Sequence, residues 1–484
     1  MSDIAFQSAT ELTAALRAGK LGSRELLDHY WQRVERLNPR INAVVTFDMD
    51  RARECADAAD AALARGELGG PLHGLPITIK DAIETAGLRT TSGAQAFAAH
   101  VPAADAPAVS RLRAAGAVIF GKTNLPTMAM DVQTYNPIFG TTNNPWDLSR
   151  SPGGSSGGAA AALAAGLCGL ELGSDIGGSI RNPAHYCGVY GHKPTHAIIP
   201  QRGHIPPPPG LLSEADIGVL GPLARRADDL DLALSVLAGP DDQRAIAWRL
   251  ELPPPRRASL REYRVAAWLD DPACPVDAAV LDRFHAGVAA LRKAGVRVDE
   301  QARPGFTLAD ADRDYLRLVY PVTTAGLPEK QFERLVGLAA TTSSDDSRLA
   351  RLAHFSTIRH REWLRAHEAR ERYRAAWAAL FRDYDVLLCP IAPTAAIAHD
   401  HNPDQNARTI RVNGQERSYW DQLVWAGLVG MALLPATVAP MGRTPSGLPV
   451  GIQIVGPYLE DRTPIDFARR LADVVGGFEA PPGY

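Results

Sequence analysis

The sequence predicts an α/β fold, in which helices pack against a sheet. Short apolar runs typical of buried strands alternate with helical stretches in the first half of the chain. Strand-like runs return close to its end, at 386–389 and 450–455. The chain has 484 residues, of which 46% are hydrophobic and 22% charged, an ordinary globular composition that allows a large core.

The N-terminal region is predicted to be helical. Ser8 and Glu11 stand at the spacing of a capping box, which favours a helix that begins there. Across 23–37 apolar residues recur at helical spacing, and the Asn-Pro pair at 38–39 predicts the end of this stretch. A second, alanine-rich helix is expected over 55–65.

Strands and helices then alternate. The run 77–79 is typical of a short strand that ends at Lys80, a helix follows over 107–115, and 117–121 resembles a buried strand. The apolar run 159–167 directly follows a glycine-rich loop and is rich in alanine, which indicates a buried helix.

The character of the chain changes between 241 and 384. This stretch is helical and arginine-rich, and Trp363, Tyr373 and Trp377 stand at helical spacing, so one helix is expected to bury an aromatic stripe. One sheet interrupted by a helical insertion accounts for this pattern better than two independent domains. The expected division is a single domain with these parts: 1–65, 66–240, 241–384 and 385–475.

Composition and charge exclude several classes of function. A formal net charge of −3 argues against nucleic-acid or anionic-membrane partners. The five cysteines are scattered without metal-ligand spacing, so we expect no metal, no cofactor and no disulfide framework. No secretory signal pattern opens the sequence, and its most apolar stretch, 158–170, is too short to span a membrane. A cytoplasmic protein is therefore expected.

Two glycine-rich runs carry the candidate chemistry. The first, Gly153-Gly154-Ser155-Ser156-Gly157-Gly158, feeds into the apolar helix, and amides at a helix N-terminus attract anions. It matches the G-x-S-x-G nucleophile elbow, but the preceding 145–152 cannot form the strand that an elbow needs. No Gly-Lys-Ser/Thr follows, which excludes a P-loop, and a flexible linker remains the plain alternative. In the second run, 173–181, consecutive amides can converge on one point, as an oxyanion hole requires.

The order of Lys80, the run 153–158 and the run 173–184 resembles the amidase signature family, and the spacing between them agrees with that family's pattern. The similarity extends over most of the chain and is weakest between about 241 and 384. It is also carried by these segments: 74–81, 121–124, 188–195 and 447–457. The resemblance implies a three-layer α/β/α fold with a central mixed sheet and a helical insertion.

The resemblance also implies a Ser-cisSer-Lys triad. Ser179 would be the nucleophile, Ser155, after a cis peptide bond, would relay the proton, and Lys80 would be the base. A lysine can act as a base near neutral pH only if burial and the absence of a carboxylate partner lower its pKa. Asp81 follows on the strand and should point to the opposite face. The oxyanion would be held by the following amides: Ile176, Gly177, Gly178 and Ser179.

The other polar residues near the runs have structural interpretations. Asp175 and Arg181 are expected to form a buried ion pair that shapes the loop, and Lys122 to be structural. A Ser-His triad is the alternative suggested by His185, His192, His196 and His204, for which packing or pocket-lining roles are preferred because the resemblance supplies a base without histidine.

Substrate contacts are expected from the loop 128–133, Met130 in particular, and from Gly154. An apolar wall of the site is expected from aromatic residues, although core packing is the plainer interpretation of each: Tyr315, Tyr320, Phe355, Tyr419, Trp420 and Trp425. Such a wall suits an aryl or long acyl amide. Aryl esters, anilides and carbamates use the same acyl-enzyme chemistry and stay open.

Two branches of the family compete. The A-type polypeptide of glutamyl-tRNA amidotransferase, which makes ammonia from glutamine for partners that handle tRNA, usually carries a Ser-Ser-Leu-Asp-Gln pattern that 213–222 lacks. The stretches 125–126 and 136–140 resemble the fatty acid amide hydrolase side of the family instead. We therefore expect a free-standing hydrolase of a small-molecule amide or ester, without nucleic-acid or membrane partners; a homodimer stays open.

Overall fold

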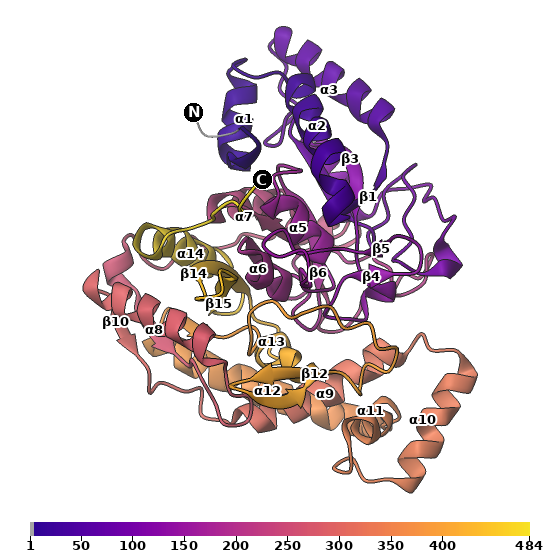
Figure 1. Ribbon diagram of the computed structural model, residues 1–484, viewed down its shortest axis with the longest axis vertical. Helices are drawn as coiled ribbons and strands as arrows, with labels where there is room; N and C mark the ends of the chain where they lie inside the picture. The colour runs from indigo at the N-terminus through magenta and orange to yellow at the C-terminus, as the bar shows by residue number, and fades with distance from the viewer. Residues whose placement is uncertain (1–3) are drawn as a thin grey trace.

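The computed structural model describes residues 4–484, and its frame is one eleven-stranded mixed sheet (Figure 1). The strands lie in the spatial order β1-β3-β2-β6-β8-β7-β14-β15-β11-β9-β10. Their bounds, in this order, are Val44–Phe47, Val118–Thr123, Pro76–Lys80, Glu171–Asp175, Val219–Ala224, Tyr190–Lys193, Ala436–Arg443, Pro449–Val455, Val386–Cys389, Arg264–Ala267 and Arg297–Asp299. Two small hairpins stand apart, β4–β5 (Tyr135–Asn136, Gly140–Thr141) and β12–β13 (Thr409–Val412, Gln415–Ser418).

Fourteen α-helices surround the sheet in the described part of the chain. In chain order, α1 to α14 are Ala9–Arg17, Ser23–Ile41, Met49–Ala64, Pro107–Ala114, Gly157–Ala164, Arg181–Cys187, Ala227–Leu237, Ala278–Lys293, Leu308–Thr324, Glu329–Thr341, Arg348–Ser356, His360–Asp383, Val424–Gly430 and Arg462–Val475. Helices α1–α3 lie at one end of the molecule and α9–α12 at the other (Figure 1).

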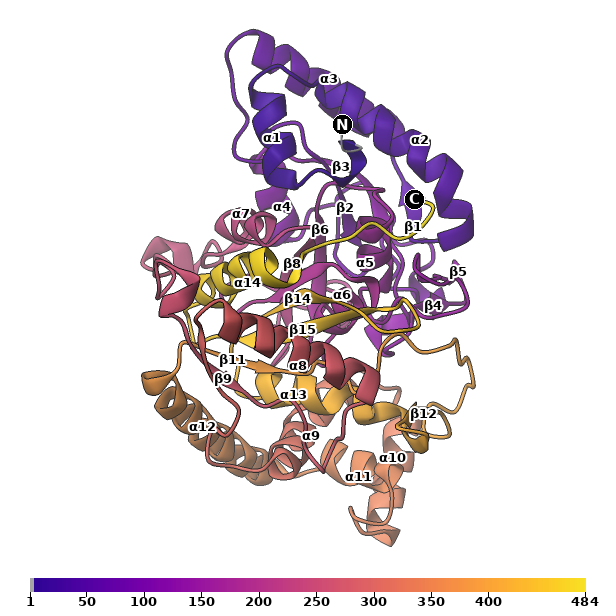
Figure 2. The ribbon, with the colours of Figure 1, turned by 60° about the vertical axis from the view of Figure 1, so that its left-hand side comes forward.

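The sheet is buried on both faces. Along β3, Val118 and Phe120 join a hydrophobic cluster with α5 and α6, whereas the intervening Ile119 joins a second cluster with α4, α7, α8 and α14. Because side chains alternate between the two faces of a strand, the two helix groups cover opposite faces. Figure 2 shows α8 and α14 in front of the sheet and α5 behind it. The predicted three-layer α/β/α fold is confirmed.

Register brings the first two candidate segments together. Strand β2 pairs in parallel with β6, with Thr78 opposite Glu171 and Ile79 opposite Leu172. Lys80, at the end of β2, therefore lies beside the end of β6, which leads into the second glycine-rich run. Ligand sites of α/β sheets form at such carboxyl ends of neighbouring parallel strands.

Most predicted elements are present, with shifted ends. The capping box forms, because the Glu11 N–H donates to Ser8 Oγ (3.0 Å) and the Ser8 N–H to Glu11 Oε2 (2.8 Å). The expected helix end at 38–39 is wrong: Pro39 lies within the last turn of α2, and Asn42, at φ 56°, ends the helix. Proline is tolerated this late because few later residues need its missing N–H.

The helical insertion also needs correction. The stretch 241–384 contributes not only helices α8–α12 but also β9 and β10, which extend the central sheet beyond β11. Strand β9 pairs in parallel with β11, with Val265 opposite Val386. The sequence signal for it is only four residues long, which explains why the helical character of its surroundings concealed it.

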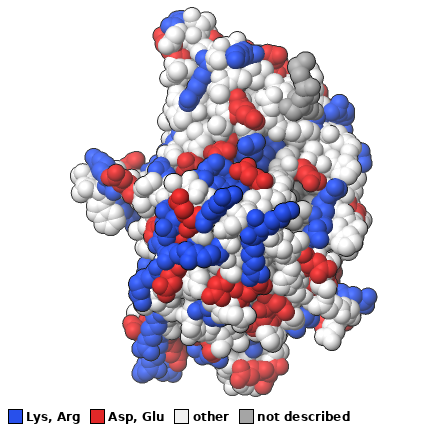
Figure 3. All heavy atoms as spheres, turned by 90° about the vertical axis from the view of Figure 1, so that its left-hand side faces the viewer, with Lys and Arg blue, Asp and Glu red and all other residues white. Residues whose placement is uncertain are grey.

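Charges of both signs alternate over the face drawn in Figure 3. Among residues 4–484, no helix is long and apolar enough to cross a bilayer.

The start of α5 is packed against backbone. A Cβ at Gly158 would lie 2.4 Å from Asn124 N and 2.8 Å from Ala43 O, neither of which can move as a side chain would. We predict that Gly158→Ala lowers the free energy of unfolding by about 1–3 kcal/mol. Gly337→Ala, in α10 with no atom within 4 Å of the new Cβ, is the control and should raise it by about 0.5–1 kcal/mol. Urea unfolding measures both, and equal effects would contradict the packing argument.

Candidate active site

A cavity of about 760 Å³ opens where the two glycine-rich runs meet. Serines from both runs face it, together with the loop before β8 and the turn between α9 and α10. Its lining comprises residues 127–130, 155, 174–176, 179, 201, 204, 206–208, 211, 213–216, 218–220, 322–323, 325–328 and 331.

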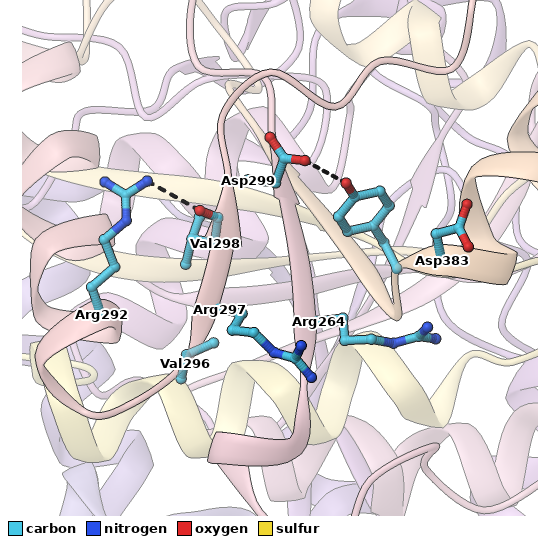
Figure 4. Close-up of a pocket in the computed structure, with 8 residues that line it drawn as sticks. Arg264, Arg292, Val296, Arg297, Val298, Asp299 and Asp383 are labelled. Carbon is cyan, nitrogen blue, oxygen red and sulfur yellow. Dashed lines mark hydrogen bonds between the residues drawn. The ribbon is translucent and has the colours of Figure 1, made fainter.

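A second hollow, of about 480 Å³, lies at the β9–β10 edge of the sheet (Figure 4). Arginine and carboxylate side chains line it, and the Tyr384 hydroxyl is hydrogen-bonded to Asp299. Arg264 at its rim is already paired with Asp385 (3.2 Å). Because the lining holds no serine, cysteine, histidine or lysine, the hollow offers no nucleophile and no base near neutral pH, and the larger cavity is the candidate site.

Lys80 stands in a cage of three serines below this cavity. Its Nζ lies 2.6 Å from Ser155 Oγ, 2.9 Å from Ser156 Oγ and 3.0 Å from Ser174 Oγ. The side chain is fully buried. Within residues 4–484 no carboxylate oxygen forms an ion pair with it, and Asp81 instead accepts hydrogen bonds from the Thr91 N–H and hydroxyl.

Burial decides the charge of this lysine. Desolvation lowers the pKa of Lys80 to about 7, while Asp175 and Glu171 act weakly in the opposite direction. Near neutral pH a large fraction of the side chain is therefore the uncharged amine, which has a lone pair and can accept a proton.

The two glycine-rich runs are joined through the serines. The Ser156 N–H donates to the Ser179 carbonyl (3.0 Å), and both Ser155 and Ser179 face the cavity. The peptide bond between Gly154 and Ser155 is cis. Ser155 is buried, whereas Ser179 is half-buried and accessible from the cavity.

A buried ion pair builds the turn that carries Ser179. Arg181 Nη2 lies 2.8 Å from Asp175 Oδ1, and both side chains are fully buried, as expected from the sequence. Asp175 also accepts the N–H groups of Gly178 (2.8 Å) and Ile180 (3.0 Å). Although burial alone would raise the pKa of Asp175, Arg181 and these N–H groups hold it well below its usual range.

This geometry corrects one part of the expected oxyanion hole. The Gly178 N–H points to Asp175 and is not available to a ligand. Within residues 4–484 the N–H groups of Ile176, Gly177 and Ser179 have no protein acceptor. Gly178 has another role, because its φ of 106° is a conformation that other residues rarely adopt.

The expected substrate contacts are only partly found. Met130 lines the cavity. Gly154 does not, because it packs against backbone, with Asp131 O only 2.7 Å from the place of a Cβ. Trp425 is also absent from the lining: it is fully buried and donates to the Cys274 carbonyl (3.0 Å). The other five aromatic residues of the expected wall do not line the cavity either. Large rings are buried in the core, and the wall consists of methionine, proline and aliphatic residues.

Three of the four histidines have packing roles, as preferred. His185 contacts Thr394 O (2.9 Å), His192 lies between Thr437 and Asp461, and His196 lies 3.4 Å from Ala215 O. Lys122 is structural too, since its Nζ donates to Ile83 O, Thr85 and Thr90.

His204 is different, because it lines the cavity and lies 2.8 Å from Ser174 Oγ. Ser156 and Ser174, the two further serines around Lys80, were not identified from the sequence. Their only signal was that each adjoins a predicted catalytic loop.

No group of three His, Cys, Asp or Glu side chains in residues 4–484 is arranged to hold a metal ion.

Comparisons with known proteins agree with this arrangement. The Amidase family model matches residues 25–464. The A-type polypeptide of the glutamyl-tRNA(Gln) amidotransferase from Acidothermus cellulolyticus is 33% identical, over 95% of this chain and 93% of that protein. A solved amidase superposes with a TM-score of 0.78 at 28% identity (97% and 100% covered). A 6-aminohexanoate cyclic dimer hydrolase superposes with a TM-score of 0.77 at 26% identity (99% of both chains).

The Asp175–Arg181 pair yields a prediction. Asp175→Asn leaves the Arg181 guanidinium buried without a counter-charge, so we expect the free energy of unfolding to fall by about 3–5 kcal/mol. Glu479→Gln removes one partner of the exposed Arg443–Glu479 pair (3.3 Å) and should change it by only about 0–1 kcal/mol. Urea unfolding at pH 7 gives both values. A loss below about 1 kcal/mol for Asp175→Asn would show that the pair does not hold the turn.

Proposed function

Because this chain belongs to the amidase signature family, we propose that it hydrolyses amide bonds of small, largely apolar substrates through Ser179, Ser155 and Lys80. Amide C–N hydrolysis is the reaction class of the family and of the solved relatives whose names state an activity. The roles of the three residues and the choice of substrate are the proposal.

One observation carries the assignment of the base. Lys80 is buried without a carboxylate partner, its pKa is lowered to about 7, and its Nζ lies 2.6 Å from Ser155 Oγ. A surface lysine would be protonated at this pH and could not accept a proton. Ser155 in turn faces the same cavity as Ser179, so a hydroxyl relay from Ser179 through Ser155 to Lys80 is short.

The reaction then has two halves. Ser179 Oγ attacks the amide carbon while its proton passes to Ser155 Oγ and the Ser155 proton passes to Lys80 Nζ. The ammonium of Lys80 returns a proton through Ser155 to the leaving amine, which breaks the C–N bond and leaves an acyl group on Ser179. Water then hydrolyses this ester by the same proton path in reverse order.

The negative oxygen of each tetrahedral intermediate needs donors that are already in place. The N–H groups of Ile176, Gly177 and Ser179 suit this role, since no protein acceptor in the described chain occupies them. We exclude the Gly178 N–H, which is held by Asp175.

The cavity favours an apolar, uncharged substrate. Its lining includes Met128, Met130, Leu211, Val322 and Leu327, and contains no lysine or arginine. Asp175, Glu214 and Asp216 also line it. Free glutamine carries an α-carboxylate, which would find no cation there and would face carboxylates instead. The lining therefore speaks against the glutamine chemistry of the amidotransferase branch, despite the 33% identity of its A-type polypeptide to this chain.

The nucleophile and substrate class are tested together. A hydrolysis screen of anilides, aliphatic amides, aryl esters, carbamates and glutamine should give turnover of the apolar amides or esters. Ser179→Ala should lower kcat at least about a thousandfold, because no other group takes over the attack. Ser110→Ala, an exposed serine of α4, is the matched control and should be active. Activity of Ser179→Ala would refute the nucleophile, and turnover of glutamine alone would favour the amidotransferase branch.

The base is tested by pH. Lys80 accepts a proton only when neutral, so kcat/KM should rise as pH increases through about 7 and level off above it. Lys80→Met should lower kcat by about 10²–10⁴-fold.

The chain offers a close control for this variant. Burial also lowers the pKa of Lys193 to about 7, but its Nζ donates to the carbonyls of Pro194 and Leu434 and touches no serine. Lys193→Met removes a similar buried amine and should keep the rise near pH 7 in its folded fraction. The lysine-base mechanism is wrong if Lys80→Met retains wild-type turnover.

A further inference from the structure

A histidine is connected to the lysine cage from the cavity side. His204 lies in the loop between β7 and β8, and its Nε2 is 2.8 Å from Ser174 Oγ. Ser174 Oγ is in turn 3.0 Å from Lys80 Nζ. The imidazole therefore reaches the base of the proposed mechanism through one hydroxyl group.

The partners of the ring determine where its proton lies. His204 Nδ1 is 2.8 Å from the Pro206 carbonyl, which can only accept, so Nδ1 carries the proton and Nε2 is the acceptor. Burial, together with the nearby Lys80 charge, lowers the pKa of His204 to about 4, so the ring is neutral at neutral pH. The hydroxyl of Ser174 must then donate to Nε2.

The second serine of the cage is also committed. Ser156 Oγ lies 3.3 Å from the Ser174 carbonyl, and a hydroxyl can only donate to a carbonyl. The hydroxyl protons of both Ser156 and Ser174 thus point away from Lys80, and both oxygens accept from its amine. A neutral amine has two N–H bonds and one lone pair. With both N–H bonds used, the lone pair is left for Ser155, at the shortest of the three distances.

We infer that His204 is a positioning residue, which orients the Ser174 hydroxyl so that the single lone pair of neutral Lys80 is directed at Ser155. This inference rests on the proposed function of Lys80 as the base. Without the acceptor at Nε2, the Ser174 hydroxyl can turn and donate to Lys80, where it competes with Ser155 for the lone pair. The fraction of enzyme that is ready to take the Ser155 proton then falls.

Two variants of His204 separate the acceptor from the ring. His204→Phe keeps the bulk of the ring and removes the acceptor, and should lower kcat about tenfold or more with KM changed less than about threefold. His204→Gln can place an amide oxygen near the position of Nε2 and should restore most of the loss. His285→Phe, at a half-exposed histidine of α8, is the control and should equal wild type.

A double-mutant cycle with Ser174→Ala distinguishes this role from a contact with substrate. Without the Ser174 hydroxyl there is nothing for His204 to orient, so His204→Phe should have no further effect on kcat in that background. The inference is refuted if His204→Phe lowers kcat equally with and without Ser174, or if it changes only KM, or if it has no effect.

Ser179→Ala is measured in parallel. If it retains turnover, the proposed function fails whatever the His204 variants do. If it is inactive and the cycle is additive, only the role of His204 is wrong.

Discussion

The site depends on one constraint, the burial of the Lys80 amine without a carboxylate. Water and carboxylates stabilise an ammonium ion, and hydroxyl groups alone do so poorly, so the three serines around Nζ leave its pKa near 7. The surroundings must therefore exclude both water and acidic groups. The sheet achieves this by burying β2 and β6 on both faces and by directing Asp81 to Thr91 instead.

Asp175 is near enough to oppose this effect, yet its charge is used elsewhere. Arg181 neutralises it, and the N–H groups of Gly178 and Ile180 bind its oxygens. The same ion pair holds the turn that presents Ser179 and its neighbouring amides. A single buried pair thus shapes the loop of the nucleophile and also reduces the pull of a carboxylate on the base. This double use explains why Gly178, though in the middle of the run, has no N–H available for an oxyanion.

The polar network extends outward to the cavity through Ser174 and His204. The network consists of hydroxyl groups, whose protons can rotate, so its function depends on what each hydroxyl donates to. Carbonyl groups and an imidazole nitrogen are acceptors of fixed direction and settle two of the three hydroxyls. Around this polar floor the walls are apolar and carry no cation, which separates the direction of proton transfer from the recognition of substrate.

The sequence by itself determined the fold class, the capping box at Ser8, the core strands and the ion pair of Asp175 and Arg181, because these depend on local periodicity or short spacing. It also singled out Lys80, Ser155 and Ser179 through motif order. Tertiary structure alone decided the rest: β9 and β10 extend the sheet, Trp425 is in the core, and Ser174 links Lys80 to His204. Which side of a side chain faces a cavity, and which acceptor a hydroxyl finds, depends on segments far apart in the chain, and no local pattern carries that information.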